Sequence, residues 1–587
     1  MVFQMMEVKV AYFLKKSNLK KGLYLQIYES FYDPARKHTA HRSVKAIGYE
    51  HELREQGIKD PISHFKAEVD KMNIERKAEK AEDKVRRIGQ ATPERHLGYF
   101  PFKAIDTMLG IERELQWLQI TSEFKFSISE LLSSLVYARL CQPCSKSKTF
   151  HDVLPLLMDK SSFSLDQLYA GIEFLGAESA KVIEVYNHAI ESLWPRDTSK
   201  TYFDCTNFYF EIDSEDDLRR KGPSKENKKE PIVGLGLLLD AECVPLGMKV
   251  FPGNESEKPV IKQVIDDMRR RTSANGKVIR VADKGLNCAD NVADAVLCGD
   301  GYVFSKSLKQ LGATDADVAI ADGEWLDVLA ADGEVRYSYK EIIDDFDYSV
   351  IDEAGKKKKV ALPEKRIVTF NPKLAKKQRG EIDRQVEKAR RLRVGGAKKS
   401  EYGDSAKYVT FTAVDVNGCV SEDKVVSTLN HKAIERARKL AGYNMLVTSE
   451  THMSAREIYD IYHNLWRIEE SFRVMKSQLD ARPVYLQKHN SIVGHFLICY
   501  VAVLLLRLLQ TKFLENKYCS EEIMSFTRGL RVVEASENRY INLAKSSKLI
   551  DDMERISGQP IGNYYLKKSE VNSIMKARLR MPASTVS

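Results

Sequence analysis

The chain has 587 residues and a formal net charge of +9, from 92 Lys and Arg against 83 Asp and Glu. This length exceeds one compact domain and predicts two to four folding units. With 43% hydrophobic and 30% charged residues and a mean hydropathy of −0.37, the composition excludes a fibrous or disordered protein.

No membrane-spanning segment is expected. The longest unbroken apolar run, 496–506, has 11 residues, whereas a spanning helix needs about 18. We therefore expect a buried core helix there. The N-terminus lacks a secretory leader, and nine Cys at irregular spacing form no disulfide framework. Both features predict a cytoplasmic protein.

Two modules are predicted at the start of the chain. Residues 1–95 contain alternating stretches typical of short strands, GLYLQIYESFY and RSVKAIGY, and then a charged helical linker. Residues 96–195 have a helical pattern throughout, as in ISELLSSLVYARL. This helical module is either plain scaffold or a module that binds DNA ends.

The pattern changes to α/β in residues 196–309. Three strands are predicted in TYFDCTNFYFEI, PIVGLGLLLD and PLGMKVFP, joined by short turns as in an antiparallel meander. A helix, the strand KVIRVA, a second helix and the strand GYVFS follow. This order is typical of a ribonuclease-H-like core, a mixed five-stranded sheet with flanking helices.

Residues 310–440 interrupt this core with short predicted strands around a basic helix, and we expect a β-rich insertion subdomain. The α/β pattern resumes in 441–515, where Ser454 and Glu457 form a capping box that opens a long helix reaching about Gln478. The tail, 516–587, is expected to be mostly helical and is a candidate for dimerisation.

Two aspartates lie at strand positions that suit chemistry. Asp204 falls inside the first α/β strand, where an acid among apolar residues needs a partner such as a metal ion. Asp283 directly follows the strand VIRVA, at the carboxyl edge where α/β proteins place functional groups. An ordinary helix N-cap explains Asp283 equally well.

Three polar residues share one face of the helix that follows the capping box. Tyr462, Glu469 and Lys476 are spaced seven residues apart, nearly two helical turns each, whereas Glu470 points about 100° away. They offer a hydroxyl, a metal-binding carboxylate and a cation. A solvated charge stripe on a surface helix is the ordinary alternative.

The segment YHNLWRIEESFRVMK, Tyr462–Lys476, resembles the Tyr-x2-Arg-x3-Glu-x6-Lys signature of bacterial insertion-sequence DDE transposases of the cut-and-paste class. Three of the four signature positions match. The arginine position holds Leu465, and Arg467 and Arg473 are the candidate replacements. The surroundings of both aspartates, TYFDCTNFYFE and VIRVADKGL, are also similar to that family.

The resemblance implies a site and a reaction. Asp204, Asp283 and Glu469 would form the catalytic triad and hold two Mg²⁺ or Mn²⁺ ions, and the long gap between Asp283 and Glu469 would hold the family's insertion. The enzyme would cut double-stranded DNA at terminal inverted repeats, close a hairpin and join the ends to target DNA. A homodimer that acts on the bacterial nucleoid is implied.

Further DNA contacts are expected outside the triad. Tyr462 and Lys476 would grip phosphates, as would Lys225 in the basic loop 219–229. Trp325 either stacks on a flipped base or is an ordinary core residue.

The positive charge gathers in one part of the insertion. Residues 355–400 hold 17 Lys and Arg against four Asp and Glu, a net +13, beginning at Lys356–Lys359. We interpret this stretch as a DNA clamp, and the alternative is a solvated loop.

Two other functions remain open on the sequence. One is a nuclease of the same fold that cuts DNA without joining it. The other is a non-catalytic DNA-binding protein derived from a transposase, although such a protein has no need to keep three carboxylates.

Overall fold

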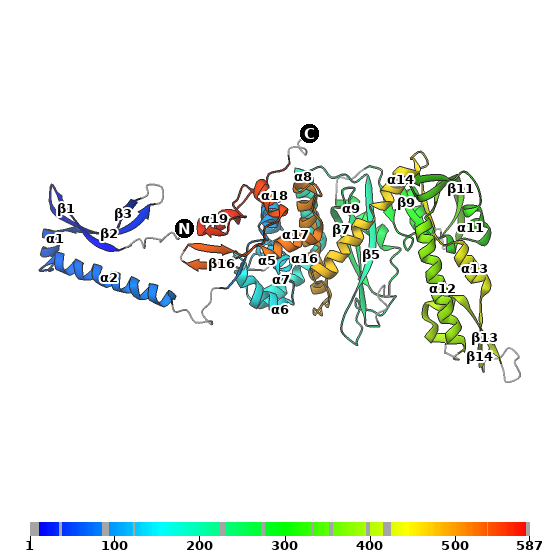
Figure 1. The fold of residues 1–587 in the computed structure, drawn as a ribbon, viewed down its shortest axis with the longest axis horizontal. Coiled ribbons are helices and arrows are strands. Elements are labelled where there is room, and N and C mark those ends of the chain that lie inside the picture. Colours follow the sequence, from blue (N-terminus) through cyan, green and yellow to red (C-terminus); the bar gives the residue numbers. More distant parts are fainter. Residues whose placement is uncertain are drawn as a thin grey trace. The chain divides into compact units, whose positions relative to one another are not determined.

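A computed structural model describes the chain at residues 11–33, 38–84, 93–120, 122, 124–223, 229–271, 276–329, 333–351, 356–394, 399–414, 424–536 and 538–582. The chain divides into two compact units, Met1–Pro93 and Glu94–Ser587 (Figure 1). Each unit has its own core.

The first unit is a small antiparallel sheet with two helices. Its sheet order is β1-β2-β3, and Leu25, Leu53 and Phe65 form its core. The strands and the charged helix expected from the sequence are present. Their bounds are β1 Tyr12–Leu19, β2 Gly22–Asp33, β3 His38–Tyr49, α1 Glu50–Glu55 and α2 Pro61–Lys84.

A nine-stranded mixed sheet forms the centre of the second unit, in the order β10-β11-β12-β15-β9-β8-β5-β6-β7. Strands β5, β6 and β7 make an antiparallel meander, and β8 and β9 continue it in parallel with β5. This fits the ribonuclease-H-like order expected from the sequence. The bounds are β5 Lys200–Tyr209, β6 Ile232–Leu239, β7 Pro245–Pro252, β8 Ile279–Ala282 and β9 Gly301–Lys306, with α9 Val260–Arg271 and α10 Ala289–Leu297 in the connections.

The five expected core strands are present, but the sheet does not end with them, because the insertion extends it to nine strands. The far edge of β9 pairs antiparallel with β15, and β12, β11 and β10 follow outward. The short strands predicted for EVRYSYKEI, 334–342, and YSVIDE, 348–353, belong to one 17-residue strand, Val335–Ile351. The bounds are β10 Leu326–Leu329, β11 Val335–Ile351, β12 Lys357–Phe370 and β15 Tyr443–Thr448.

The rest of the insertion folds around its own small core, which includes Ile382, Tyr408 and Ile434. The expected basic helix is α12, Pro372–Val394, and with the β13–β14 hairpin it extends away from the central sheet in Figure 1. The other bounds here are η4 Leu308–Gln310, α11 Ala313–Ile320, η5 Lys399–Tyr408, β13 Val409–Val414, β14 Lys424–Leu429 and α13 His431–Lys439.

Helices pack around α16, His489–Leu508, which carries the long apolar run. Together with η7, Leu509–Phe513, it is apolar and long enough to cross a bilayer, yet its most apolar window is entirely buried inside the protein. The expectation of a core helix is therefore confirmed. Helices α5 and α7 pack directly against it.

Residues 96–195 are helical, as predicted, and their core continues into that of α16. The bounds are α3 Phe100–Leu109, α4 Ile111–Gln119, α5 Ile128–Cys141, α6 Lys146–Lys148, η2 Thr149–Val153, η3 Leu154–Leu156, α7 Leu165–Ala177 and α8 Ser179–Leu193.

The tail is less helical than expected. Its three strands join Arg95–His96 (β4) in a four-stranded sheet of order β18-β17-β16-β4. The end of the chain is thereby paired with the start of the second unit. The bounds are α17 Ser520–Gly529, β16 Arg531–Ser536, β17 Arg539–Asn542, α18 Lys548–Ser557, β18 Tyr565–Lys567 and α19 Lys568–Ile574.

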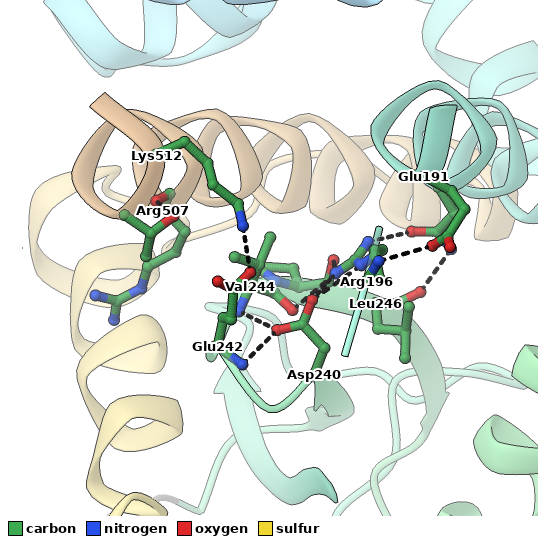
Figure 2. Close-up of polar contacts among 11 residues, drawn as sticks. Glu191, Arg196, Asp240, Glu242, Val244, Leu246, Arg507 and Lys512 are labelled. Atoms are coloured by element: carbon green, nitrogen blue, oxygen red, sulfur yellow. Dashed lines mark hydrogen bonds and ion pairs between the residues drawn. The ribbon is translucent and has the colours of Figure 1, made fainter. Parts of the chain in front are cut away.

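Polar contacts attach the sheet to the helices at the turn between β6 and β7 (Figure 2). Arg196, after α8, forms a 2.7 Å ion pair with Asp240 of this turn, and both side chains are at most 3% exposed. Lys512 of η7 pairs with Glu242 of the same turn. The meander that carries Asp204 is thus fixed to the helical layer from two sides.

Candidate functional site

Sheet register brings Asp204 and Asp283 to neighbouring strands. In the parallel pair β5–β8, Phe203 lies opposite Ala282. Asp204 is the next residue of β5, and Asp283 is the first residue after the end of β8. Neighbouring strands lie about 4.8 Å apart and residues in register project to the same face. The two half-buried carboxylates therefore share one face of the sheet.

The Asp283 carboxylate is held by hydroxyl groups. Ser305 of β9 and Tyr462 donate hydrogen bonds to its Oδ1, at 2.8 and 3.0 Å. Burial raises the pKa of Asp283, but hydrogen bonds from the Lys284 backbone N–H, Ser305 and Tyr462 outweigh this, so the pKa lies below its usual value. Asp283 is therefore ionised at neutral pH.

The helical segment that follows the capping box is not one continuous helix. The capping box of Ser454 and Glu457 is confirmed and opens α14, Ala455–His463. The chain then turns at 464–465, forms α15, Trp466–Arg473, and ends in the π-helical turn η6, Val474–Gln478. The break and the π turn change the angular spacing of Tyr462, Glu469 and Lys476 that a straight helix would give.

The two ends of this segment lie against the strands that carry the aspartates. Tyr462 reaches Asp283, and the Lys476 ammonium lies 5.4 Å from the centre of the Phe208 ring of β5. Phe208 is four residues after Asp204 and therefore on the same face of β5. The structure thus brings Tyr462 and Lys476 to the face that holds the aspartates.

Glu469 is exposed on α15, between these ends. Burial raises the pKa of Tyr462, and the charges of Asp283 and Glu469 raise it further. Glu469 is therefore within electrostatic reach of the Tyr462–Asp283 pair. Nevertheless, no three His, Cys, Asp or Glu side chains in the described part of the chain are grouped closely enough to hold a metal ion.

The candidate arginines lie elsewhere. Leu465 is buried, and Arg467 lies 4.2 Å from the Trp466 ring centre and 3.5 Å from the Glu470 carboxylate. Arg473 is exposed in the last turn of α15. Arg467 is therefore engaged with Glu470 and not with Asp283.

Buried contacts hold α15 in place and were not expected from the sequence. The Arg507 guanidinium of α16, 2% exposed, donates to Glu470 at 3.0 Å and to the Ser471 hydroxyl at 3.1 Å. Ser520 donates to the other oxygen of Glu470 at 2.8 Å. The sequence signal for the Arg507–Glu470 pair was Arg507 itself, a basic residue that directly follows the apolar run 496–506.

A cavity of about 490 Å³ opens beside Asp283. Its wall is basic and aromatic, a composition that suits a phosphate and a base. Burial lowers the pKa of Lys306, as does the nearby charge of Arg366. The charged and aromatic lining residues are Lys284, Lys306, Lys309, Tyr337, Tyr443, Tyr459, Tyr462 and His463.

The other expected DNA contacts lie around the insertion. Trp325 is half-buried, packs edge-on against Tyr443 at a centroid distance of 6.0 Å, and lies under the Lys340 ammonium. Tyr443 lines the cavity, so Trp325 contacts a residue of its wall. Lys225 lies outside the described residues. Lys357–Lys359 begin β12 and pair with the end of β11.

A family model described as "Transposase DDE domain" matches residues 209–505, just over half of the chain. The match includes Asp283, Tyr462, Glu469 and Lys476 and begins five residues after Asp204. The search of curated proteins gives no match.

Proposed function

Because the chain belongs to the family of transposase DDE domains, we propose that it cuts DNA at the inverted repeats of its element and joins the ends to target DNA. The observation that carries this proposal is the position of Asp204 on β5 and of Asp283 directly after β8, each one residue beyond the register pair Phe203–Ala282. Tyr462 and Lys476 lie at the same face.

The donor set suits hard divalent cations. Asp204 and Asp283 offer carboxylate oxygens on one face, and Asp283 is ionised. We propose that these two residues and Glu469 hold two Mg²⁺ or Mn²⁺ ions, with Glu469 completing the set when DNA is bound. Such ions supply Lewis-acid activation of the attacking and leaving oxygens of a phosphodiester.

The protein's own groups would orient the DNA. The raised pKa of Tyr462 keeps its phenol protonated, so it remains a donor to Asp283 or to a phosphate oxygen. Lys476 would attract the scissile strand as a point charge. Arg473 and Lys225 are proposed as further backbone contacts, and Trp325 as the stacking partner of a base extruded when a hairpin forms.

The partners follow from this reaction. The substrates would be double-stranded terminal repeats and target DNA, and a homodimer would pair the two ends. The basic segment that begins at Lys356 would lie along the DNA backbone.

The triad is tested with isosteric variants Asp204→Asn, Asp283→Asn and Glu469→Gln. Each should lower Mn²⁺-dependent nicking of labelled terminal-repeat duplex by at least about 10³-fold, because each removes an anionic ligand. Binding of the duplex in EDTA should change less than about threefold.

Asp290→Asn is the matched control, since Asp290 is an exposed aspartate in the first turn of α10. Full nicking by any triad variant removes that residue from the site. A strand-transfer assay on the wild-type protein separates a transposase from a nuclease, which would release cut ends without joining them.

A further inference from the structure

A second cavity, of about 650 Å³, lies apart from the carboxylates, between the end of α5 and the segment 480–486. Four basic side chains line it: Arg139, Lys146, Lys148 and His495. Asp480 is the one carboxylate among its lining residues. The cavity is therefore a basic site in a protein whose carboxylate site is elsewhere.

Lys146 is the unusual member of this group. Its side chain is buried, with 6% of the residue exposed, and its ammonium forms no hydrogen bond or ion pair with any residue that the structure describes. A buried charge without a partner is costly and is normally paired or neutralised. An unpaired ammonium in a cavity wall therefore indicates that an anion from outside the chain completes the site.

The groups around Lys146 strengthen this indication. Burial lowers its pKa, and so does the Arg139 charge, while the nearby thiols of Cys499 and Cys144 act in the opposite direction. Burial likewise lowers the pKa of His495, followed by the charges of Lys146 and Arg139. His495 is therefore uncharged at neutral pH, and an anion in the cavity would relieve the repulsion between Lys146 and Arg139.

Arg139 ties the cavity to the segment that carries Lys476. Its guanidinium donates to the backbone oxygens of Leu479 and Asp480, at 3.3 and 3.4 Å. These residues directly follow the η6 turn. Farther along, Arg482 lies 5.5 Å from the Tyr209 ring centre at the end of β5. Lys476 lies on the face of the aspartates, and the chain that continues from it, through Leu479 and Asp480, reaches the cavity.

Two exposed tyrosines are among the residues that line the cavity. Tyr169 of α7 is 38% exposed and Tyr485 is 68% exposed, and both line the cavity. Exposed tyrosines beside a basic groove are typical of surfaces that track a nucleic-acid strand, because bases stack on aromatic rings. A free inorganic anion has no base that could stack on these tyrosine rings.

We propose that this cavity binds a backbone phosphate of the DNA strand that leads away from the carboxylate site, with Lys146 as its principal contact. The inference rests on the proposed transposase function and adds to it a DNA-binding site at the helical layer. A free nucleotide offers the same phosphate chemistry, so the test has one experimental arm for each source.

The test variant is Lys146→Met, which keeps the length of the side chain and removes its charge. Full-length protein in EDTA is titrated into a fluorescein-labelled 30-base-pair duplex taken from the DNA that flanks the reading frame. We expect affinity to fall about tenfold, and the slope of log K against log salt to become shallower by about one. The melting temperature should rise, since the variant no longer buries a charge.

Two further variants keep the test decisive. Lys148→Met removes an exposed cation of the same cavity and should weaken binding by about threefold. Lys181→Met removes an exposed lysine of α8 that pairs with Glu178, and it should leave affinity within about twofold. If Lys146→Met fails to fold, the duplex affinities of Lys148→Met and Lys181→Met are compared. Equal affinities of these two variants would then overturn the proposal.

The second arm measures the melting temperature of wild-type and Lys146→Met protein with dAMP and with inorganic phosphate at millimolar concentration. Unchanged duplex affinity in Lys146→Met overturns the proposal, and a dAMP shift that disappears in that variant would assign the cavity to a free nucleotide instead. Lys146-dependent binding without any DNA cleavage by the wild type would refute the proposed function and leave the cavity's role intact.

Discussion

At the scale of single residues, the central fact is that Asp283 is oriented by neighbours on two other elements. Ser305 on β9 and Tyr462 on α14 both donate to the same carboxylate oxygen. Hydrogen bonds to a charged carboxylate favour the ionised form. Tyr462 thereby acts on Asp283 before any substrate arrives, which the sequence did not predict for it.

This contact gives a testable pH dependence. Tyr462→Phe removes a donor that lowers the pKa of Asp283, so that pKa should rise and the acid limb of the cleavage profile should move to higher pH. Cleavage at neutral pH should fall by about tenfold, the effect of one hydrogen bond to a charged group. The measurement is the rate of Mn²⁺-dependent nicking from pH 5 to 9.

Tyr459→Phe is the matched control, because Tyr459 lies on the same helix with its ring stacked on Tyr337 at 4.7 Å. Its acid limb should coincide with that of the wild type. A Tyr462→Phe profile that also coincides with the wild type would contradict the positioning role.

At the scale of elements, the site depends on how the β5–β7 meander attaches to the helices. Asp240, in the turn after β6, accepts from the Glu242 and Val244 backbone N–H groups at 3.1 and 2.9 Å and pairs with Arg196. Arg196 in turn donates to the Asn187 side chain of α8 at 2.7 Å. One buried guanidinium therefore joins helix, linker and sheet.

Breaking this pair should cost stability. Arg196→Met leaves a buried carboxylate without its cation, which we expect to lower the free energy of unfolding by about 3 kcal/mol, at the lower end for such pairs because backbone N–H groups still satisfy Asp240. Adding Asp240→Asn to Arg196→Met should recover part of this stability. Urea unfolding measures the free energy of unfolding of the single variant Arg196→Met and of the double variant with Asp240→Asn. Equal destabilisation of the single and double variants would contradict the role of the unpaired Asp240 charge.

At the scale of the whole molecule, charge is distributed unevenly. The strongly basic stretch 355–400 includes strand β12 and helix α12. Several cations of α12, among them Lys376, Lys377 and Arg379, are exposed. A surface of this kind neutralises DNA phosphates and makes binding sensitive to salt.

The contribution of α12 can be measured as a salt slope. Replacing Lys376, Lys377 and Arg379 by Gln should make the slope of log K against log salt shallower by up to about 2.7, because each phosphate that is no longer neutralised accounts for about 0.9. The triple variant Lys181→Gln, Lys548→Gln and Lys568→Gln removes the same charge from exposed positions elsewhere and is the control. Equal slopes in the two would assign the effect to net charge alone.

Local chemistry in the sequence determined several features of this protein. Short apolar and aromatic runs bounded by turns specified the strands β5, β6 and β7. The Ser454 capping box set the start of α14, and the apolar run 496–506 produced the buried helix α16. Such features depend on residues a few positions apart, and so they can be predicted from spacing.

Only the tertiary structure decided the features that depend on pairing between distant segments. The open edge of β9 accepts β15, so the insertion extends the sheet to nine strands in place of five. The Tyr462–Asp283 hydrogen bond and the Arg507–Glu470 pair join residues that are 179 and 37 positions apart. Strand order and such contacts follow from which surfaces meet in three dimensions, and residue spacing alone does not contain that information.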